Sequence, residues 1–98
     1  MARPEQITLD VPAAVGAGKP THVFRFRDKT VQIGGVFAGT VQLEGTLDGE
    51  HFTAIGAALS APGFVLVPMC IVSLRVQVTA LSAGAPIATF GGFDYRAV

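Results

Sequence analysis

Residues 40–49, TVQLEGTLDG, have the pattern of a β-strand followed by a turn. Every second side chain from residue 41 to Leu47 is apolar apart from Gly45, and the positions between them are polar. This period of two is typical of a half-buried β-strand. At Gly45, the missing side chain permits a bulge or a close backbone approach. The dipeptide Asp48-Gly49 is typical of a two-residue type I′ turn, so these residues predict one arm and the turn of a β-hairpin.

The same alternation recurs along the rest of the chain. Phe24 and Phe26 alternate with polar or smaller neighbours, and Gly, Pro and Asp punctuate the runs. No stretch has apolar residues at the 3.6-residue spacing of an amphipathic helix. The expected strands lie in residues 7–11, 23–27, 31–33, 40–47, 52–55, 64–67, 72–80 and 87–95. We therefore predict a single all-β domain over residues 1–98, an antiparallel β-sandwich or jelly-roll-like barrel of about seven or eight short strands.

Composition restricts the classes of function. Seven basic and seven acidic residues give a net charge of zero, so the basic excess of nucleic-acid-binding proteins is missing. Half of the residues are hydrophobic and 14% are charged, which predicts apolar surface that a partner covers. Residues 1–10 lack the apolar core of a signal peptide, and the apolar run 64–72 is short for a membrane span and interrupted by Pro68. We expect synthesis in the cytoplasm and binding to neither nucleic acid nor membrane. Cys70, the single cysteine, is expected to be a small buried hydrophobe.

Side chains that commonly carry chemistry are few and scattered. Neither His22 nor His51 has a second potential ligand two or four residues further on, so no metal site is predicted. Glu44, Asp48 and Glu50 gather around the turn, where a Ca²⁺ site is one interpretation and ordinary turn chemistry on a soluble strand face is the preferred one. No serine lies in a nucleophile elbow, and no glycine-rich phosphate loop is present. We therefore predict no enzymatic activity, no cofactor and no resident metal.

Two apolar segments are candidate contact surfaces. The segment that contains Phe64 and Leu66 is apolar on both strand faces, which predicts a central strand or one covered by a partner. Ile7 and Leu9 belong to residues 1–11, predicted to be an extended N-terminal arm that adds a strand to a neighbouring protein, or else an edge strand.

One basic segment is a third candidate contact surface. Arg25, Arg27 and Lys29 share a parity and are expected to form a small basic face. The preferred interpretation is a solvated strand edge whose charges prevent aggregation. The functional interpretation is electrostatic docking onto an acidic protein surface.

Two segments resemble a known class of proteins. Residues 39–53, GTVQLEGTLDGEHFT, resemble the pattern GTVTLEGSLDGxNWT, and residues 74–84 are similar to the strand and turn RVxVTAYTSG. Both occur in small β-sandwich structural proteins of tailed bacteriophages, including capsid decoration (cement) proteins. The resemblance covers about residues 32–93. Carbohydrate-binding sandwiches of the discoidin type carry a comparable hairpin, but Phe52 stands here where tryptophan is usual.

The resemblance implies a non-enzymatic virion protein. Proteins of this kind sit on the outer capsid surface as symmetric trimers or dimers and reinforce the junctions of the major capsid protein. The partners implied are therefore the major capsid protein and further copies of this chain, with a homotrimer favoured and a dimer as the alternative. Another head-fibre or tail component, or a module that binds carbohydrate or another surface ligand, is the alternative function.

Overall fold

The computed structural model describes residues 3–94, which form nine strands and no helix. Two of these strands, Gly16–Ala17 and Thr21–His22, contain two residues each and were not predicted, whereas one strand, Phe26–Gly34, replaces the two predicted over residues 23–27 and 31–33. In chain order the strands are β1 (Arg3–Leu9), β2 (Gly16–Ala17), β3 (Thr21–His22), β4 (Phe26–Gly34), β5 (Phe37–Thr46), β6 (Thr53–Ala54), β7 (Gly63–Val67), β8 (Ser73–Gly84) and β9 (Ile87–Asp94).

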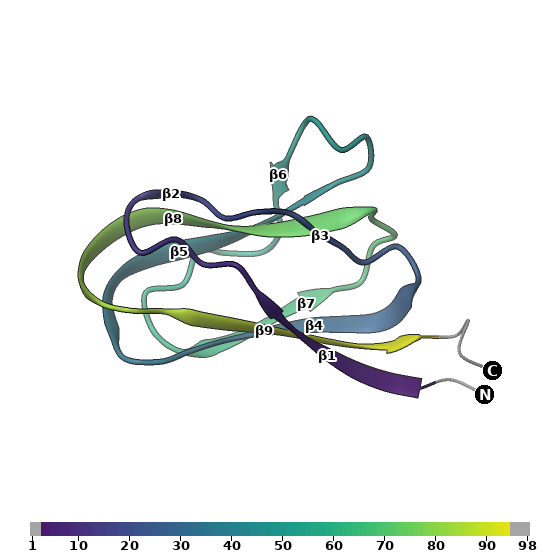
Figure 1. The fold of residues 1–98 in the computed structure, drawn as a ribbon, viewed down its shortest axis with the longest axis horizontal. Coiled ribbons are helices and arrows are strands. Elements are labelled where there is room, and N and C mark those ends of the chain that lie inside the picture. Colours follow the sequence, from purple (N-terminus) through teal and green to yellow (C-terminus); the bar gives the residue numbers. More distant parts are fainter. Residues whose placement is uncertain (1–2, 95–98) are drawn as a thin grey trace.

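The strands form two antiparallel sheets packed face to face (Figure 1). The order in the first sheet is β1-β9-β4-β7. In the second sheet, β2 and β3 both pair with one edge of β8, and β5 and β6 follow on its other side. The prediction of an all-β antiparallel sandwich is confirmed.

Two glycine turns carry the chain from one sheet to the other at one end of the sandwich. β4 passes into β5 through Gly35, and β8 passes into β9 at Gly84. Their φ angles of 86° and 78° lie in the left-handed region that glycine adopts without strain. The two turns also touch, because the Ala85 N–H donates to the Val36 carbonyl oxygen at 3.1 Å and a Cβ on Gly84 would collide with the same oxygen.

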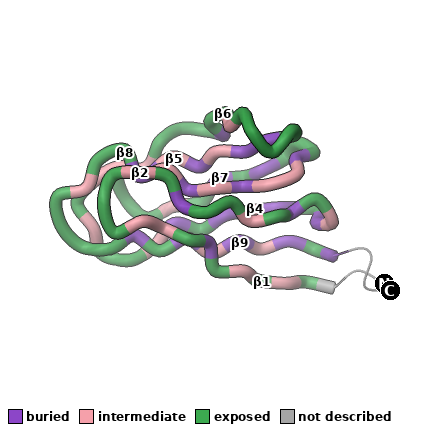
Figure 2. Tube along the Cα trace, turned by 45° about the horizontal axis from the view of Figure 1, so that its top comes forward, coloured by how far each residue is buried: buried purple, intermediate pink, exposed green. Residues whose placement is uncertain are grey.

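Buried and exposed residues alternate along the long strands (Figure 2). The buried side chains fill the space between the two sheets. Phe90 is the largest fully buried side chain, and its ring meets that of Phe26 edge-on at 5.1 Å between centroids. Burying one such side chain contributes roughly 1.5–3 kcal/mol, so this layer is the main source of stability. The buried apolar residues are Leu9, Val23, Phe26, Val31, Ile33, Val41, Leu43, Ile55, Val65, Val67, Ile71, Leu74, Val76, Val78, Ala88 and Phe90.

The strand-turn stretch 40–49 departs from prediction at its end. β5 stops at Thr46 and β6 starts at Thr53, so residues 47–52 form a loop instead of a two-residue hairpin turn. Among the described residues, positive φ is found at Gly49 but not at Asp48, whereas a type I′ turn needs both. Leu47 is 69% exposed while Thr46 is buried, so the apolar parity breaks where the loop begins. Gly45 does face the core, because a Cβ there would lie 2.7 Å from Ile55 Cδ1.

The chain also bends just before β4, which corrects the strand predicted over residues 23–27. The Phe26 N–H donates to the Val23 carbonyl oxygen at 3.0 Å and closes a turn. As a result Val23 and Phe26 are both buried, while Phe24 between them is 59% exposed. Local alternation put Phe24 and Phe26 on one face, and the turn separates them.

Residues near the N-terminus form part of the domain's own first sheet. Arg3–Leu9 pair with β9 along their full length, so β1 is an edge strand and not a free arm. Leu9 is buried in the core, and Ile7 packs against it. Residues 1–2 of the predicted arm lie outside the described residues.

Candidate functional site

The predicted basic segment and the predicted apolar segment meet at one cleft. It has a volume of about 980 Å³ and lies between residues 24–30 and residues 66–71. The antiparallel pairing of β4 with β7 brings the two segments together, because Lys29 lies opposite Val67 and Thr30 opposite Leu66. Arg25, Arg27, Lys29 and Leu66 all line this cleft.

A β-bulge at Asp28 decides which of the cations that line the cleft is buried. The register of β4 against β9 shifts between Arg27 and Thr30, and Asp28 has a φ of 54°. Aspartate tolerates this left-handed conformation better than most residues, and a bulge inserts one extra residue and reverses parity beyond it. Lys29 therefore turns inward while Arg27 stays exposed, so the cations do not form the single basic face that alternation predicts. Asp28 itself, between two cations in a strand, is the sequence signal that could have indicated the bulge.

Lys29 is a buried cation that lines this cleft. The residue is only 9% exposed, and its ammonium group donates to the Phe26 carbonyl oxygen at 3.3 Å. No carboxylate of residues 3–94 forms an ion pair with it. An ammonium group has three donors, so Lys29 can still donate to an acceptor that enters the cleft.

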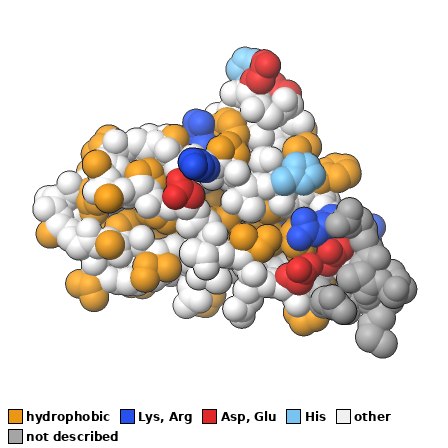
Figure 3. Space-filling model, viewed as in Figure 1, with side chains coloured by type: hydrophobic (Ala, Val, Ile, Leu, Met, Phe, Trp, Pro, Cys, Tyr) orange, Lys and Arg blue, Asp and Glu red, His pale blue; other side chains and the backbone are white. Residues whose placement is uncertain are grey.

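Arg25 is held by carboxylates of the first sheet. Its Nε donates to Asp94 Oδ2 at 2.9 Å, its Nη2 lies 4.0 Å from Glu5 Oε2, and its guanidinium lies 4.2 Å from the centroid of the Phe26 ring. Figure 3 shows basic and acidic side chains gathered near the end of the molecule where both termini lie. Arg25 therefore joins β1, β9 and the bend before β4, and its charge is compensated within the domain.

The apolar contact residues separate into two groups. Phe64 and Leu66 are 69% and 70% exposed on the outer face of β7. β7 is an edge strand and not a central one. Phe64 and Leu66 face solvent because they point away from the second sheet, and no part of residues 3–94 covers that outer face over them. Ile7 and Leu9 instead pack in or against the core, which leaves them little surface for a partner.

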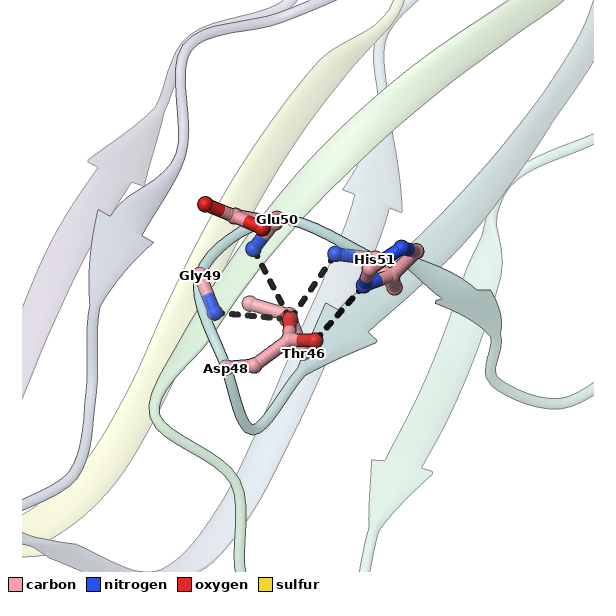
Figure 4. A network of polar contacts seen from close by, with 5 residues as sticks. All are labelled: Thr46, Asp48, Gly49, Glu50 and His51. Carbon is pink, nitrogen blue, oxygen red and sulfur yellow. Dashed lines mark hydrogen bonds and ion pairs between the residues drawn. The ribbon is translucent and has the colours of Figure 1, made fainter.

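The carboxylate of Asp48 organises the loop that follows β5 (Figure 4). Its Oδ1 accepts hydrogen bonds from the backbone N–H groups of His51 and Glu50, both at 2.8 Å, and from the Thr46 hydroxyl at 2.9 Å. Its Oδ2 lies 2.7 Å from His51 Nδ1, and the Gly49 N–H donates to Thr46 Oγ1 at 3.0 Å. The His51 backbone and ring contacts, followed by those from Glu50 and Thr46, hold the pKa of the Asp48 carboxyl well below its usual range.

These contacts favour the turn interpretation of the acidic cluster over a Ca²⁺ site. The protein's own donors occupy both Asp48 oxygens, and Glu44 is engaged elsewhere, accepting from Arg75 Nε at 2.7 Å. Within residues 3–94 no group of three or more His, Cys, Asp or Glu side chains is placed to hold a metal ion.

The ring of Phe52 packs against another side chain of the domain. The Arg75 guanidinium lies 4.0 Å from the centroid of its ring, a cation–π contact that covers one ring face. Arg75 is also the partner of Glu44, so loop and sheet are joined through one arginine. The aromatic at the position of the usual tryptophan is therefore a packing residue.

Cys70 is exposed, which corrects the prediction of a buried thiol. β7 ends at Val67, and Pro68 begins an irregular link in which Met69 is 41% exposed. Ile71 fills the core position instead. The strand predicted over residues 64–67 ends before the proline, and strand parity does not extend into the link that contains Cys70.

Comparison with known proteins identifies the fold. No protein-family model and no curated protein matches the sequence. The crystal structure of the SPBc2 prophage-derived protein YomS matches with a TM-score of 0.80 at 13% identity, covering 95% of each chain. A chain of the Bacillus endospore appendages, which form disulfide-linked pili, matches with a TM-score of 0.54 at 13% identity, over 93% of this chain and 87% of that one. The fold is shared with a prophage-derived protein. Separately, no helix long and apolar enough to cross a membrane occurs within the described residues.

Proposed function

We propose that this chain is a structural protein of a tailed bacteriophage and, within that class, a capsid decoration subunit. The observation that carries the proposal is the likeness to the prophage-derived YomS over 95% of both chains. The resemblance of residues 39–53 to phage β-sandwich proteins is an independent support from sequence. The partners are the major capsid protein and further copies of this chain, as a homotrimer or a dimer, on the outer surface of the virion.

The cleft beside Lys29 is the surface that docks onto the capsid. Its walls include Phe24, Leu66 and Met69, all substantially exposed, and Lys29 is a cation without an ion-pair partner among residues 3–94. This combination suits an acidic side chain flanked by apolar ones. Apolar contact area supplies affinity, and pairing of the partner's carboxylate with the ammonium supplies register.

The mechanism is stabilisation by binding and requires no chemistry. A ligand that binds only the intact lattice stabilises it by RT ln(1 + [L]/Kd), about 2.7 kcal/mol per site at a free concentration of 100 Kd. The stabilising free energies of many sites on one capsid add together, so modest affinity at each site raises the temperature at which the shell ruptures.

The test is calorimetry on expanded capsids that lack the protein. Adding the wild-type chain should raise the rupture temperature and leave a stoichiometric amount bound after sedimentation. Lys29→Met should bind more weakly, whereas Val15→Lys, at a residue 62% exposed and outside the cleft, should bind like the wild type. Equal rupture temperatures with and without the wild-type chain would refute the decoration role.

A second candidate within the virion is a head-fibre or tail component. The likeness to a subunit of the endospore appendages, which are filaments, favours this alternative. Gold-labelled antibody on intact virions separates the two, because label on the capsid faces supports decoration and label on the tail or a fibre supports the alternative.

A carbohydrate- or surface-ligand-binding module is the remaining alternative. The sequence contains no tryptophan, and Arg75 covers one face of the Phe52 ring. A glycan array probed with the labelled chain tests this alternative, and retention of a defined glycan would support it over a purely structural role.

A further inference from the structure

The edges of the two sheets differ sharply in their protection against pairing with another strand. Natural edges are protected by charge, by proline or by being very short. β1 carries Pro4 and Glu5, β6 has two residues, and β2 and β3 have two residues each with Lys19-Pro20 between them. β7, the remaining edge, is five residues long with the sequence GFVLV and has neither charge nor proline.

The outer side of β7 is open and apolar. Among the described residues, no backbone hydrogen bond outside the strand ladders involves residues 63–67. Phe64 and Leu66 project from the outer face and are 69% and 70% exposed. Their neighbours on β4 are Gln32 and Thr30, which are uncharged. Covering Phe64 and Leu66 would therefore not bury a charged side chain at the paired positions.

We propose that β7 pairs with β7 of a second copy of this chain, antiparallel about a two-fold axis at Val65. In that register Phe64 of one copy lies opposite Leu66 of the other, and the same contact forms twice. The two four-stranded first sheets then continue through the axis as one sheet. An isologous contact of this kind closes as a dimer and leaves no free apolar edge.

A second copy fits this edge better than an unrelated strand for two reasons. The pattern GFVLV is nearly self-complementary about Val65, with a large apolar residue on each side of it. The chain has a net charge of zero, so no net repulsion opposes association of two copies. The proposal does not depend on the phage assignment, and it favours the dimer over the trimer that the sequence resemblance implies.

Sedimentation velocity of the full chain over a range of concentrations tests the self-association. The wild type should shift from monomer to dimer as the concentration rises. Phe64→Lys should remain monomeric, because a lysine on an edge strand prevents pairing and Phe64 does not line the cleft. Val15→Lys adds the same charge at a residue that is 62% exposed on another part of the surface, so it should dimerise like the wild type. Circular dichroism checks that each variant folds.

Disulfide trapping tests the register. Opposed Cα atoms in an antiparallel pair lie about 4.5–5.5 Å apart, within the range that a disulfide spans. In a Cys70→Ser background, mixing Phe64→Cys with Leu66→Cys should give a cross-linked dimer that neither variant gives alone. A wild type that is monomeric at every concentration overturns the proposal, as does equal cross-linking in the separate variants. If the wild-type chain is monomeric and Phe64→Lys abolishes its binding to capsids, the edge of β7 pairs with a strand of a partner protein and not with a second copy.

Discussion

Replacing Gly45 by alanine should destabilise the sandwich by crowding the terminal methyl groups of two core isoleucines. A Cβ at this position would lie 2.7 Å from Ile55 Cδ1 and 3.2 Å from Ile71 Cδ1. Overpacking of a core costs about 1–3 kcal/mol, and the low end applies here because both crowded atoms end flexible side chains. Reduced entropy of the unfolded chain offsets about 0.4–1 kcal/mol, since Gly45 does not have a positive φ. We therefore expect a small net loss, up to about 0.6 kcal/mol, in the free energy of unfolding.

The second substitution, Ile55→Val, removes the closer of the two crowded methyl groups. Alone it should cost about 0.5–1.5 kcal/mol as an ordinary loss of buried methyl. In the double variant the methyl group introduced by Gly45→Ala occupies part of the vacated space, so the loss should be smaller than the sum of the single losses by about 1 kcal/mol. Coupling of this size is expected between residues in direct contact and not between distant ones.

Urea unfolding of the four proteins measures this cycle, with free energies from linear extrapolation. In a domain of this size, 1 kcal/mol corresponds to about 4–8 °C in Tm, which gives a second readout. Gly34→Ala is the matched control, because no atom lies within 4 Å of a Cβ there, and it should be neutral or slightly stabilising. Strict additivity of Gly45→Ala and Ile55→Val would show that the two side chains do not meet and would refute the packing argument.

Three further substitutions test the loop, the cleft and the ion pair at the end of the sandwich. Asp48→Asn should loosen the loop. Hydrogen exchange should then become faster at the backbone amides of Glu50 and His51, which donate to the Asp48 carboxylate in the wild type. Because the folded-state pKa of Asp48 is lowered, wild-type protection should persist down through about pH 4, the ordinary Asp range, and be lost only at more acid pH. Lys29→Met should raise the free energy of unfolding by about 1 kcal/mol, because a buried ammonium group with a single 3.3 Å bond is replaced by an apolar chain of similar size, and a loss of stability would contradict this reasoning. Arg25→Ala should lower the free energy of unfolding, measured in urea, by about 1–2 kcal/mol, because Asp94, with a side chain 7% exposed, loses its hydrogen-bonded ion pair with Arg25, and an unchanged midpoint would show that this pair contributes nothing.

The alternation of apolar and polar residues determined the fold class. A period of two with turn residues between the runs leaves no helical face to bury, and it correctly placed residues such as Val41 and Leu43 in the core. Gly45 was also assigned correctly, because its position in the alternation alone put it on the apolar side. These inferences succeed because side-chain parity in an uninterrupted strand is a local property.

The tertiary structure decided the features that a local pattern cannot encode. The bulge at Asp28 reverses parity and turns Lys29 into the cleft, and the turn before Phe26 exposes Phe24. Whether β7 is central or at an edge depends on which strands pair with it, and those partners lie far away in the sequence. The sequence alone therefore determined a β-sandwich with spare apolar surface. Long-range strand pairing and the packing of the two sheets determined where that surface lies, because together they fix which apolar side chains are left uncovered.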